Sequence, residues 1–128
     1  MISFKSFLLV GAGGFIGSML RYLMTVVFKD FSVMPIGTLI SNLSGCFLIG
    51  IITGLSIDIP HFSNEVRLFL ATGICGGFTT LSSFTYEVGK FARDGEYLFG
   101  SLYLIGTLLG AALTFCLGLM LVKILARG

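Results

Sequence analysis

The sequence has few charged residues, and this scarcity excludes most soluble folds. Asp, Glu, Lys and Arg make up 11% of its 128 residues, whereas 55% are hydrophobic. A soluble domain of this length must cover its surface with polar side chains, and this chain has too few. The charges are also clustered: residues 36–57, 68–86 and 97–122 contain none, and residues 6–28 contain only Arg21. The composition therefore indicates a membrane protein.

Residues that could build a metal site or a catalytic centre are also scarce. Cys46, Cys75 and Cys116 lie in three different hydrophobic stretches and have no metal-ligand spacing, so we expect them to be small packing residues. No acidic residue lies near the middle of a hydrophobic stretch. Glu87 and Arg21 lie near the ends of theirs, where long side chains can reach the membrane interface. Without a nucleophile–base pair or a metal cluster, the chain is not expected to be an enzyme.

The long uncharged stretches predict transmembrane helices, because a helix needs about 20 mostly apolar residues to cross a bilayer. The predicted spans are residues 5–28, 36–57, 66–90 and 97–123. The loops between them are short, so residues 1–128 are expected to form one all-α domain of four transmembrane helices. Lys5 followed by an apolar run resembles a signal peptide, but the run is too long, and we expect a retained helix.

The positive charges give the chain no preferred orientation. Cytoplasmic loops normally carry the excess of Lys and Arg. With four spans, one side holds Lys5, Arg67, Lys123 and Arg127, and the other holds Arg21, Lys29, Lys90 and Arg93. An unbiased chain can insert both ways, and two copies can then pair antiparallel. This balance predicts a dual-topology homodimer, although a coincidence in a small count would look the same.

A glycine-rich segment in the first span resembles a nucleotide-binding turn. Residues 9–18 read LVGAGGFIGS. In a dinucleotide-binding fold, this turn follows a strand and precedes a helix, and an acidic residue comes about 20 positions later. Here the nearest acid, Asp30, lies in a short loop before another apolar span. Neither a nucleotide nor a nucleic acid is therefore an expected partner.

The same glycines fit helix packing in a membrane. Small residues four apart mark the faces on which transmembrane helices meet. Each span has such a pair: Gly13 with Gly17, Gly50 with Gly54, Gly73 with Gly77, and Gly106 with Gly110. The sequence therefore predicts a tightly packed bundle.

The third span contains a polar segment in its middle. Gly76 and Gly77 are followed by Thr79 and Thr80, and then by Ser82 and Ser83. Glycine, serine and threonine are poor residues for a continuous helix. A break at membrane depth survives only where protein, water or an ion satisfies the freed backbone groups. The alternative is an unbroken helix with a glycine contact face and hydroxyls bonded back to the previous turn, and the residues alone do not decide between the two.

Other polar residues lie at the same depth. Thr38 and Asn42 share a face of the second span, and Tyr103 and Thr107 share a face of the fourth. A buried Asn is costly without a partner, so Asn42 is a functional candidate, with contact between helices as the alternative. Hydroxyls, one amide and aromatic edges suit passive permeation of a small ion better than proton-coupled exchange.

Three segments resemble one family over essentially the whole chain. GGFIGSMLRY at 13–22, GTLISNLSGCFLIG at 37–50 and TGICGGFTTLSSFTYE at 72–87 are similar to the Fluc (CrcB) fluoride channels. The resemblance implies a multi-pass protein of the bacterial cell (inner) membrane and a dual-topology homodimer with two fluoride pores. It also implies a third helix broken at its centre and a structural sodium ion at the dimer interface. Such channels export fluoride and lower its toxicity.

The resemblance also assigns roles to individual residues. Asn42 would be the pore amide, and Phe84 a pore ring whose positive edge faces the anion. Further pore residues would be Thr38, Ser82, Ser83, Tyr103 and Thr107. The glycine pair would open the third helix, and the backbone carbonyls of Gly76 and Thr79 from both subunits would hold sodium.

One residue departs from the family pattern. Leu81 stands where the family usually has a second phenylalanine, and leucine offers no ring edge. We expect fluoride still to permeate, with the hydroxyls taking a larger share of its coordination.

Two rival functions share some of these features. A small four-span, dual-topology, proton-coupled multidrug antiporter would need a glutamate inside the first span, and this chain has none. A non-transporting packing subunit would explain the glycines but not the polar segment of the third span.

Overall fold

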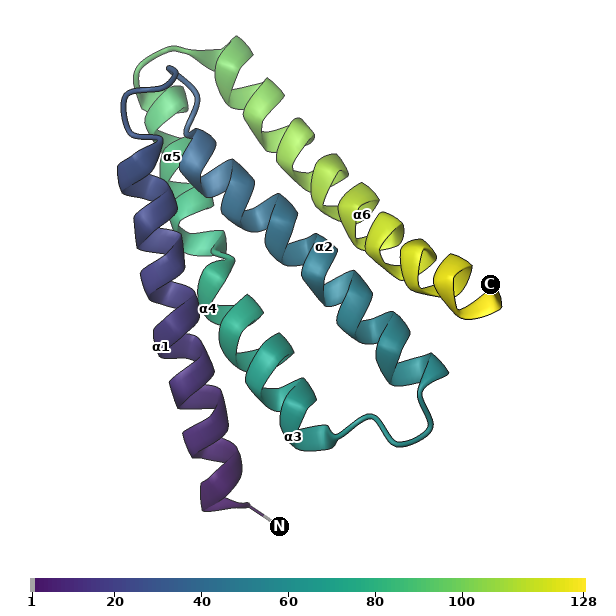
Figure 1. Ribbon diagram of the computed structural model, residues 1–128. Helices are drawn as coiled ribbons and strands as arrows, with labels where there is room; N and C mark the ends of the chain where they lie inside the picture. Colours follow the sequence, from purple (N-terminus) through teal and green to yellow (C-terminus); the bar gives the residue numbers. More distant parts are fainter. Residues whose placement is uncertain (1) are drawn as a thin grey trace.

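The computed structural model describes residues 2–128 and contains only helices and short connections in that range (Figure 1). The elements are α1 (Phe4–Val27), α2 (Ile36–Asp58), α3 (Asn64–Arg67), the π-helix η1 (Leu68–Cys75), α4 (Gly76–Phe78), α5 (Leu81–Arg93) and α6 (Tyr97–Arg127). Four stretches are long and apolar enough to cross a membrane: Phe4–Val27, Ile36–Asp58, Asn64–Arg93 and Tyr97–Arg127. The four predicted spans correspond to four long apolar helices, and the third of these is a compound helix that is broken at Thr79 and Thr80.

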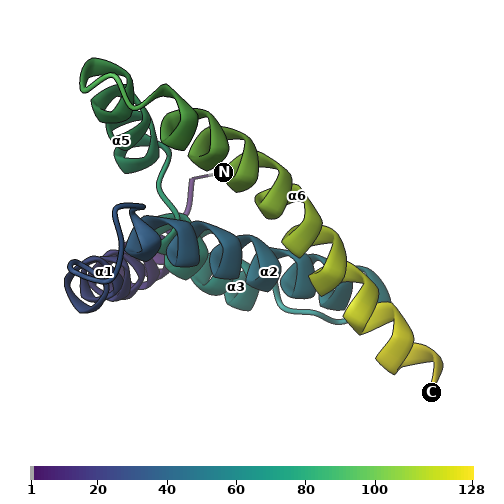
Figure 2. The same cartoon turned by 90° about the horizontal axis from the view of Figure 1, so that it is seen from above.

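The helices form two pairs whose members run parallel. The first half of the third span, from α3 to α4, packs along α1, and α6 packs along α2 (Figure 1). Seen from above, α5 and the start of α6 lean away from the other helices, and α6 crosses toward the far end of α2 (Figure 2). The break therefore lets α5 leave α1 and pack against α6.

Glycines bring the backbones of each pair into contact. Gly13 and Gly17 of α1 face the backbone of η1 and α4, and Gly77 faces Gly14. Gly50 and Gly118 similarly bring α2 and α6 together. Three of the four predicted pairs lie wholly at contacts within the chain. The fourth does not, because a side chain added at Gly106 would meet nothing within 4 Å.

This packing predicts opposite effects for two alanine substitutions on α1. In Gly17→Ala the new methyl group would press on backbone atoms, including Phe78 N at 2.9 Å, which cannot rotate away. We expect a loss of about 1–3 kcal/mol, the usual cost of overpacking. Gly11→Ala is the control because it has open space, and alanine is the better helix former by about 1 kcal/mol. Thermal unfolding in detergent would measure both, and equal melting temperatures would contradict the close packing.

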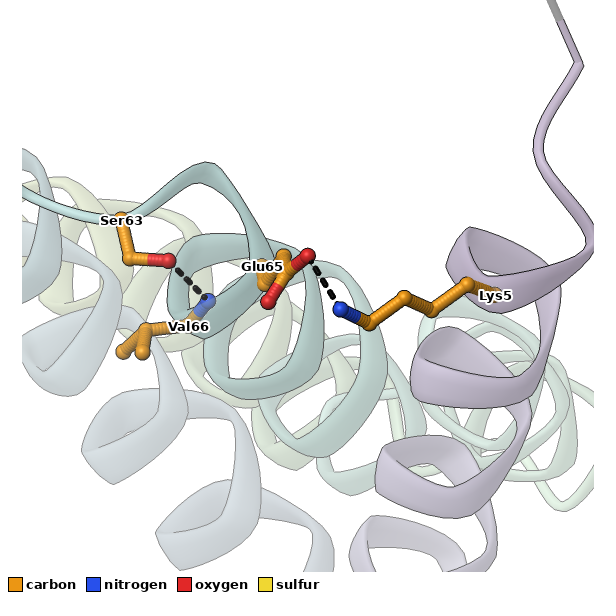
Figure 3. A network of polar contacts seen from close by, with 4 residues as sticks. All are labelled: Lys5, Ser63, Glu65 and Val66. Carbon is orange, nitrogen blue, oxygen red and sulfur yellow. Dashed lines mark hydrogen bonds and ion pairs between the residues drawn. The ribbon is translucent and has the colours of Figure 1, made fainter.

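The third span begins with a capped turn beside the start of α1 (Figure 3). Ser63 Oγ accepts a hydrogen bond from Val66 N at 3.5 Å and so caps α3. Lys5 Nζ lies 2.6 Å from Glu65 Oε1, and both side chains are largely exposed. An exposed ion pair contributes at most about 1 kcal/mol. Its geometry nevertheless places the beginnings of the two parallel helices at the same end of the bundle.

Small and polar residues make up much of the interior, together with a few larger side chains such as Phe84 and Tyr103, while most large apolar side chains lie on the outside. Exposed residues include many Leu, Ile, Val and Phe side chains, as a lipid-facing surface requires. The buried polar side chains are Thr38, Ser41, Asn42 and Thr107. They lie on α2 and α6, beside the break in the third span.

Candidate functional site

Asn42 of α2 holds the broken backbone of the third span. Its Nδ2 donates to the carbonyl of Thr80 at 3.1 Å, and its Oδ1 accepts from Thr80 N at 2.7 Å. The side chain is only 8% exposed. An amide group carries two N–H donors, so one remains after the bond to Thr80. Asn42 is thus a structural partner of the break that also retains one free donor.

The break falls at the two threonines, and the expectation that the glycine pair opens the helix is wrong. Gly76 and Gly77 keep helical geometry, whereas Thr79 and Thr80 are extended. Gly77 stays helical because it packs on the backbone of α1. Thr80 leaves the helix because Asn42 satisfies both its backbone groups and because its own Oγ1 accepts from Ser83 N at 3.1 Å, which caps α5.

The break redirects two backbone donors. In a continuous α-helix, the N–H groups of Thr80 and Ser83 would bond to the carbonyls four residues earlier, those of Gly76 and Thr79. Here both donate to side-chain oxygens instead. The carbonyls of Gly76 and Thr79 therefore lose their usual partners.

A second polar cluster surrounds Glu87 of α5. Thr38 Oγ1 donates to Glu87 Oε1 at 2.7 Å, and Tyr103 Oη donates to Glu87 Oε2 at 2.6 Å. The ring of Phe84 lies 5.3 Å from the ring of Tyr103, centroid to centroid, at an angle of 56°. Phe84 and Tyr103 are both buried. One carboxylate thus joins α2, α5 and α6.

A cavity of about 540 Å³ opens beside this cluster, near the loop between α1 and α2. Thr38 and Glu87 line it, together with charges of both signs. Those other charged residues are Lys29, Lys90, Asp94 and Glu96. The cavity therefore reaches the buried Thr38 and has no large excess of one charge.

Glu87 and Arg21 lie near the ends of their spans, where long side chains can reach the membrane interface. In the structure, both also form hydrogen bonds within the protein. Arg21 Nε donates to the carbonyl of Gly77 at 3.1 Å, in the last turn before the break. The cation lies at the C-terminal end of a helical segment, where it is favourable. The sequence signal for these internal bonds was the presence of polar residues on the neighbouring helices. A long charged side chain can form hydrogen bonds with them.

Seven of the ten expected site residues lie in these two clusters, and Gly76, Leu81 and Thr107 do not. Thr38, Phe84 and Tyr103 meet at Glu87, while Asn42, Thr79, Ser82 and Ser83 lie at the break. Gly76, Leu81 and Ser82 are exposed on the surface of the single chain, and Leu81 is 74% exposed. Thr107 is buried on α6, one turn beyond Tyr103. Among residues 2–128, His, Cys, Asp and Glu side chains form no group of three that could hold a metal ion.

Comparison with known proteins assigns this arrangement to a family. The sequence model described as "CrcB-like protein, Camphor Resistance (CrcB)" matches residues 8–119. The chain belongs to the CrcB family. The match includes every residue of the two polar clusters.

Relatives in this CrcB family match along nearly their whole length. A "Fluoride-specific ion channel FluC" of Prosthecochloris aestuarii is 48% identical over 122 residues, which cover 94% of this chain and 95% of the relative. The protein of that name from Chlorobium phaeobacteroides (strain BS1) is 48% identical over 124 residues, with coverage of 96% and 97%. That from Chlorobaculum tepidum is 46% identical over 121 residues, with coverage of 94% and 96%. With four apolar helices, this CrcB protein is a multi-pass membrane protein of bacterial type, and its relatives are named as ion channels, not enzymes.

Proposed function

We propose that the chain forms a fluoride-selective passive channel that exports fluoride and lowers its toxicity. Support comes first from the relatives, which are named as fluoride-specific channels and match nearly end to end. The observation that carries the proposal in this chain is the free N–H of Asn42, held beside a break at membrane depth. Neutral donors can replace the water around a small anion without trapping it.

Further pore groups line up with this amide. Phe84 turns toward Tyr103, and the edge of an aromatic ring carries partial positive charge. Ser83 and Thr107 add hydroxyls near the break and on α6, and the cavity beside Glu87 would be the entrance from water. An anion would thus pass from the cavity along α2, α5 and α6.

An antiparallel homodimer with two pores completes the proposal. Gly76, Leu81 and Ser82 are exposed around the break, and irregular backbone at membrane depth must be covered by protein or water. A second copy would cover it. The balanced Lys and Arg residues permit both orientations of the chain, so the two copies can be antiparallel.

The released carbonyls fit a sodium ion at the dimer interface. Gly76 and Thr79 have lost their helical donors, and carbonyl oxygens at a helix break suit a monovalent cation. Gly76 is exposed, so its carbonyl is available to a site shared with the second copy. Bound sodium would supply positive charge that holds the two breaks together, while Asn42 and Thr80 hold each break open.

Fluoride efflux from liposomes tests the function. Purified protein is reconstituted into vesicles loaded with potassium fluoride, valinomycin is added, and a fluoride electrode follows the external solution. We expect rapid release of fluoride, with chloride retained in parallel vesicles and no need for a proton gradient. Well-folded dimers that release no fluoride would contradict the proposal. Release only under a proton gradient would favour the rival antiporter.

A further inference from the structure

The break in the third span also releases the carbonyl of Gly77. In a continuous α-helix this carbonyl would accept the N–H of Leu81, four residues later. Here Thr79 and Thr80 are extended, and Leu81 begins a new helix. The side chain of Arg21 donates to the carbonyl instead, with 3.1 Å between Nε and the oxygen. Arg21 therefore replaces a backbone donor that the break removes.

The face of α1 that carries Arg21 explains how its side chain reaches the third span. Gly13 and Gly17 lie one and two turns earlier on that face and contact the backbone of η1 and α4 (Figure 1). Residues four apart share a helix face, and each side chain leans over the preceding turn. The turn before Arg21 contains Gly17, which has no side chain. Arg21 can therefore extend along the contact between α1 and α4 to Gly77.

No carboxylate in the structure accounts for the charge of Arg21. In residues 2–128 there are two ion pairs, both exposed, and neither includes Arg21. A cation within a membrane span is costly and marks a functional position by default. The side-chain contact that the structure gives Arg21 is its part-buried bond to Gly77. Its role is therefore to be sought at the break.

Arg21 and Asn42 hold opposite sides of the break. Asn42 of α2 forms two bonds with Thr80, on the C-terminal side. Arg21 of α1 holds the carbonyl of Gly77, on the N-terminal side. Two side chains from different helices thus fix the backbone on both sides of Phe78 and Thr79, and one of the released carbonyls is used within the chain.

We propose that Arg21 is a positioning residue for the sodium site at the break. The inference rests on the proposed site, in which the carbonyls of Gly76 and Thr79 bind sodium. The carbonyl of Gly77 lies between them in the sequence. By occupying it, Arg21 fixes the backbone that carries the two ligands and removes a competing ligand. A guanidinium group is not deprotonated in proteins, so this bond does not depend on pH.

The charge of Arg21 and its hydrogen bond would affect sodium in opposite ways. A positive charge near the site repels a cation, so removal of the charge alone would strengthen sodium binding. Loss of the hydrogen bond would free the Gly77 carbonyl and loosen the backbone beside it, so sodium binding would weaken. The positioning role requires the second effect to be the larger one.

Sodium-dependent unfolding of Arg21→Met tests this role. The melting temperature of the purified dimer in detergent is followed as sodium chloride replaces choline chloride. It starts to rise near the sodium dissociation constant, because a ligand stabilises the state that binds it. We expect Arg21→Met to raise this onset concentration about tenfold or more, as for a lost hydrogen bond to a charged group.

Two further variants make the result specific. Arg21→Lys keeps the charge but loses the Nε–H that binds the carbonyl, so it should also raise the onset, by several-fold. Ser18→Ala is the matched control on α1. Its hydroxyl is exposed and bonded to the carbonyl of Phe15 in the same helix, so the onset should stay at the wild-type concentration.

The outcomes separate this inference from the proposals on which it rests. A wild type whose stability does not depend on sodium would contradict the sodium site and this inference with it, while fluoride efflux would still test the channel. A sodium-dependent wild type with an unchanged onset in Arg21→Met would overturn the inference alone, even where that variant is less stable at every sodium concentration. A lower onset would assign Arg21 a repulsive charge and overturn it as well. If Arg21→Met does not assemble, an unchanged onset in Arg21→Lys overturns the inference in the same way.

Discussion

Asn42→Ala should reduce fluoride efflux by about a hundredfold or more. The substitution removes the free N–H offered to the anion and both bonds to the backbone of Thr80. A hydrogen bond to a charged group contributes roughly 1.5–3 kcal/mol, and each 1.4 kcal/mol changes a rate about tenfold. The loss of Thr80's partner adds to this, because an unsatisfied backbone group in hydrocarbon costs several kcal/mol. Efflux from liposomes measures the effect.

Two further variants make the Asn42 result specific. Thr53→Val on the same helix removes a hydroxyl bonded to Ile49, so efflux should be unchanged. Asn42→Asp keeps an acceptor for Thr80 N but removes both N–H donors, so it should assemble better than Asn42→Ala and still conduct poorly. Size-exclusion chromatography reports assembly. Asn42→Ala dimers that conduct normally would exclude the pore role, whereas loss of assembly in every Asn42 variant would favour the packing-subunit alternative.

Phe84→Ile should have the second large effect and nearly abolish efflux, while Leu81→Phe should change it by no more than about twofold. Phe84 is 5% exposed and its ring contacts Tyr103, whereas Leu81 is 74% exposed and belongs to neither polar cluster. Isoleucine fills much of the same volume but has no ring edge to face an anion. An expected fall of about a hundredfold corresponds to about 2.7 kcal/mol, more than aromatic packing alone contributes.

Each substitution serves as the control for the other, because both lie on α5. Phe84→Ile replaces an aromatic ring with an aliphatic side chain, and Leu81→Phe does the reverse. Both are measured as initial efflux rates per reconstituted dimer, with unfolding temperatures to detect misfolding. Phe84→Ile vesicles that empty at the wild-type rate would exclude the ring from the pore. A several-fold faster Leu81→Phe channel would show that a second ring is used, and that Leu81 is a functional departure in this chain.

The sequence was sufficient to predict the four helices, because long uncharged stretches have few alternatives to crossing a membrane. It predicted the polar segment of the third helix but placed its opening at the wrong residues. Intrinsic helix propensity favours a break at Gly76 and Gly77. Packing of Gly77 on α1 and the bonds from Asn42 to Thr80 reverse that preference. These contacts join segments far apart in the sequence, so local helix propensity cannot predict them.

The direction in which long charged side chains turn was also not predictable from the sequence. Glu87 and Arg21 lie close enough to helix ends to reach the interface, and sequence position alone cannot tell which way they turn. The structure turns Glu87 toward two hydroxyls and Arg21 toward a carbonyl. Ser41 escaped prediction for a similar reason. Its lack of a hydrogen-bond partner is visible only once the helices are packed together.

The bond between Arg21 and Gly77 also has a consequence for biosynthesis. The two residues are 56 positions apart, so α1 leaves the ribosome before its partner carbonyl has been made. An arginine in the membrane costs roughly 2.5–3.5 kcal/mol at the centre of a newly inserted helix. Arg21 lies near the end of α1, so until the third helix arrives its side chain can lower that cost by reaching the membrane interface. The bond between Arg21 and the third helix can thus form only after the segment around Gly77 has been made.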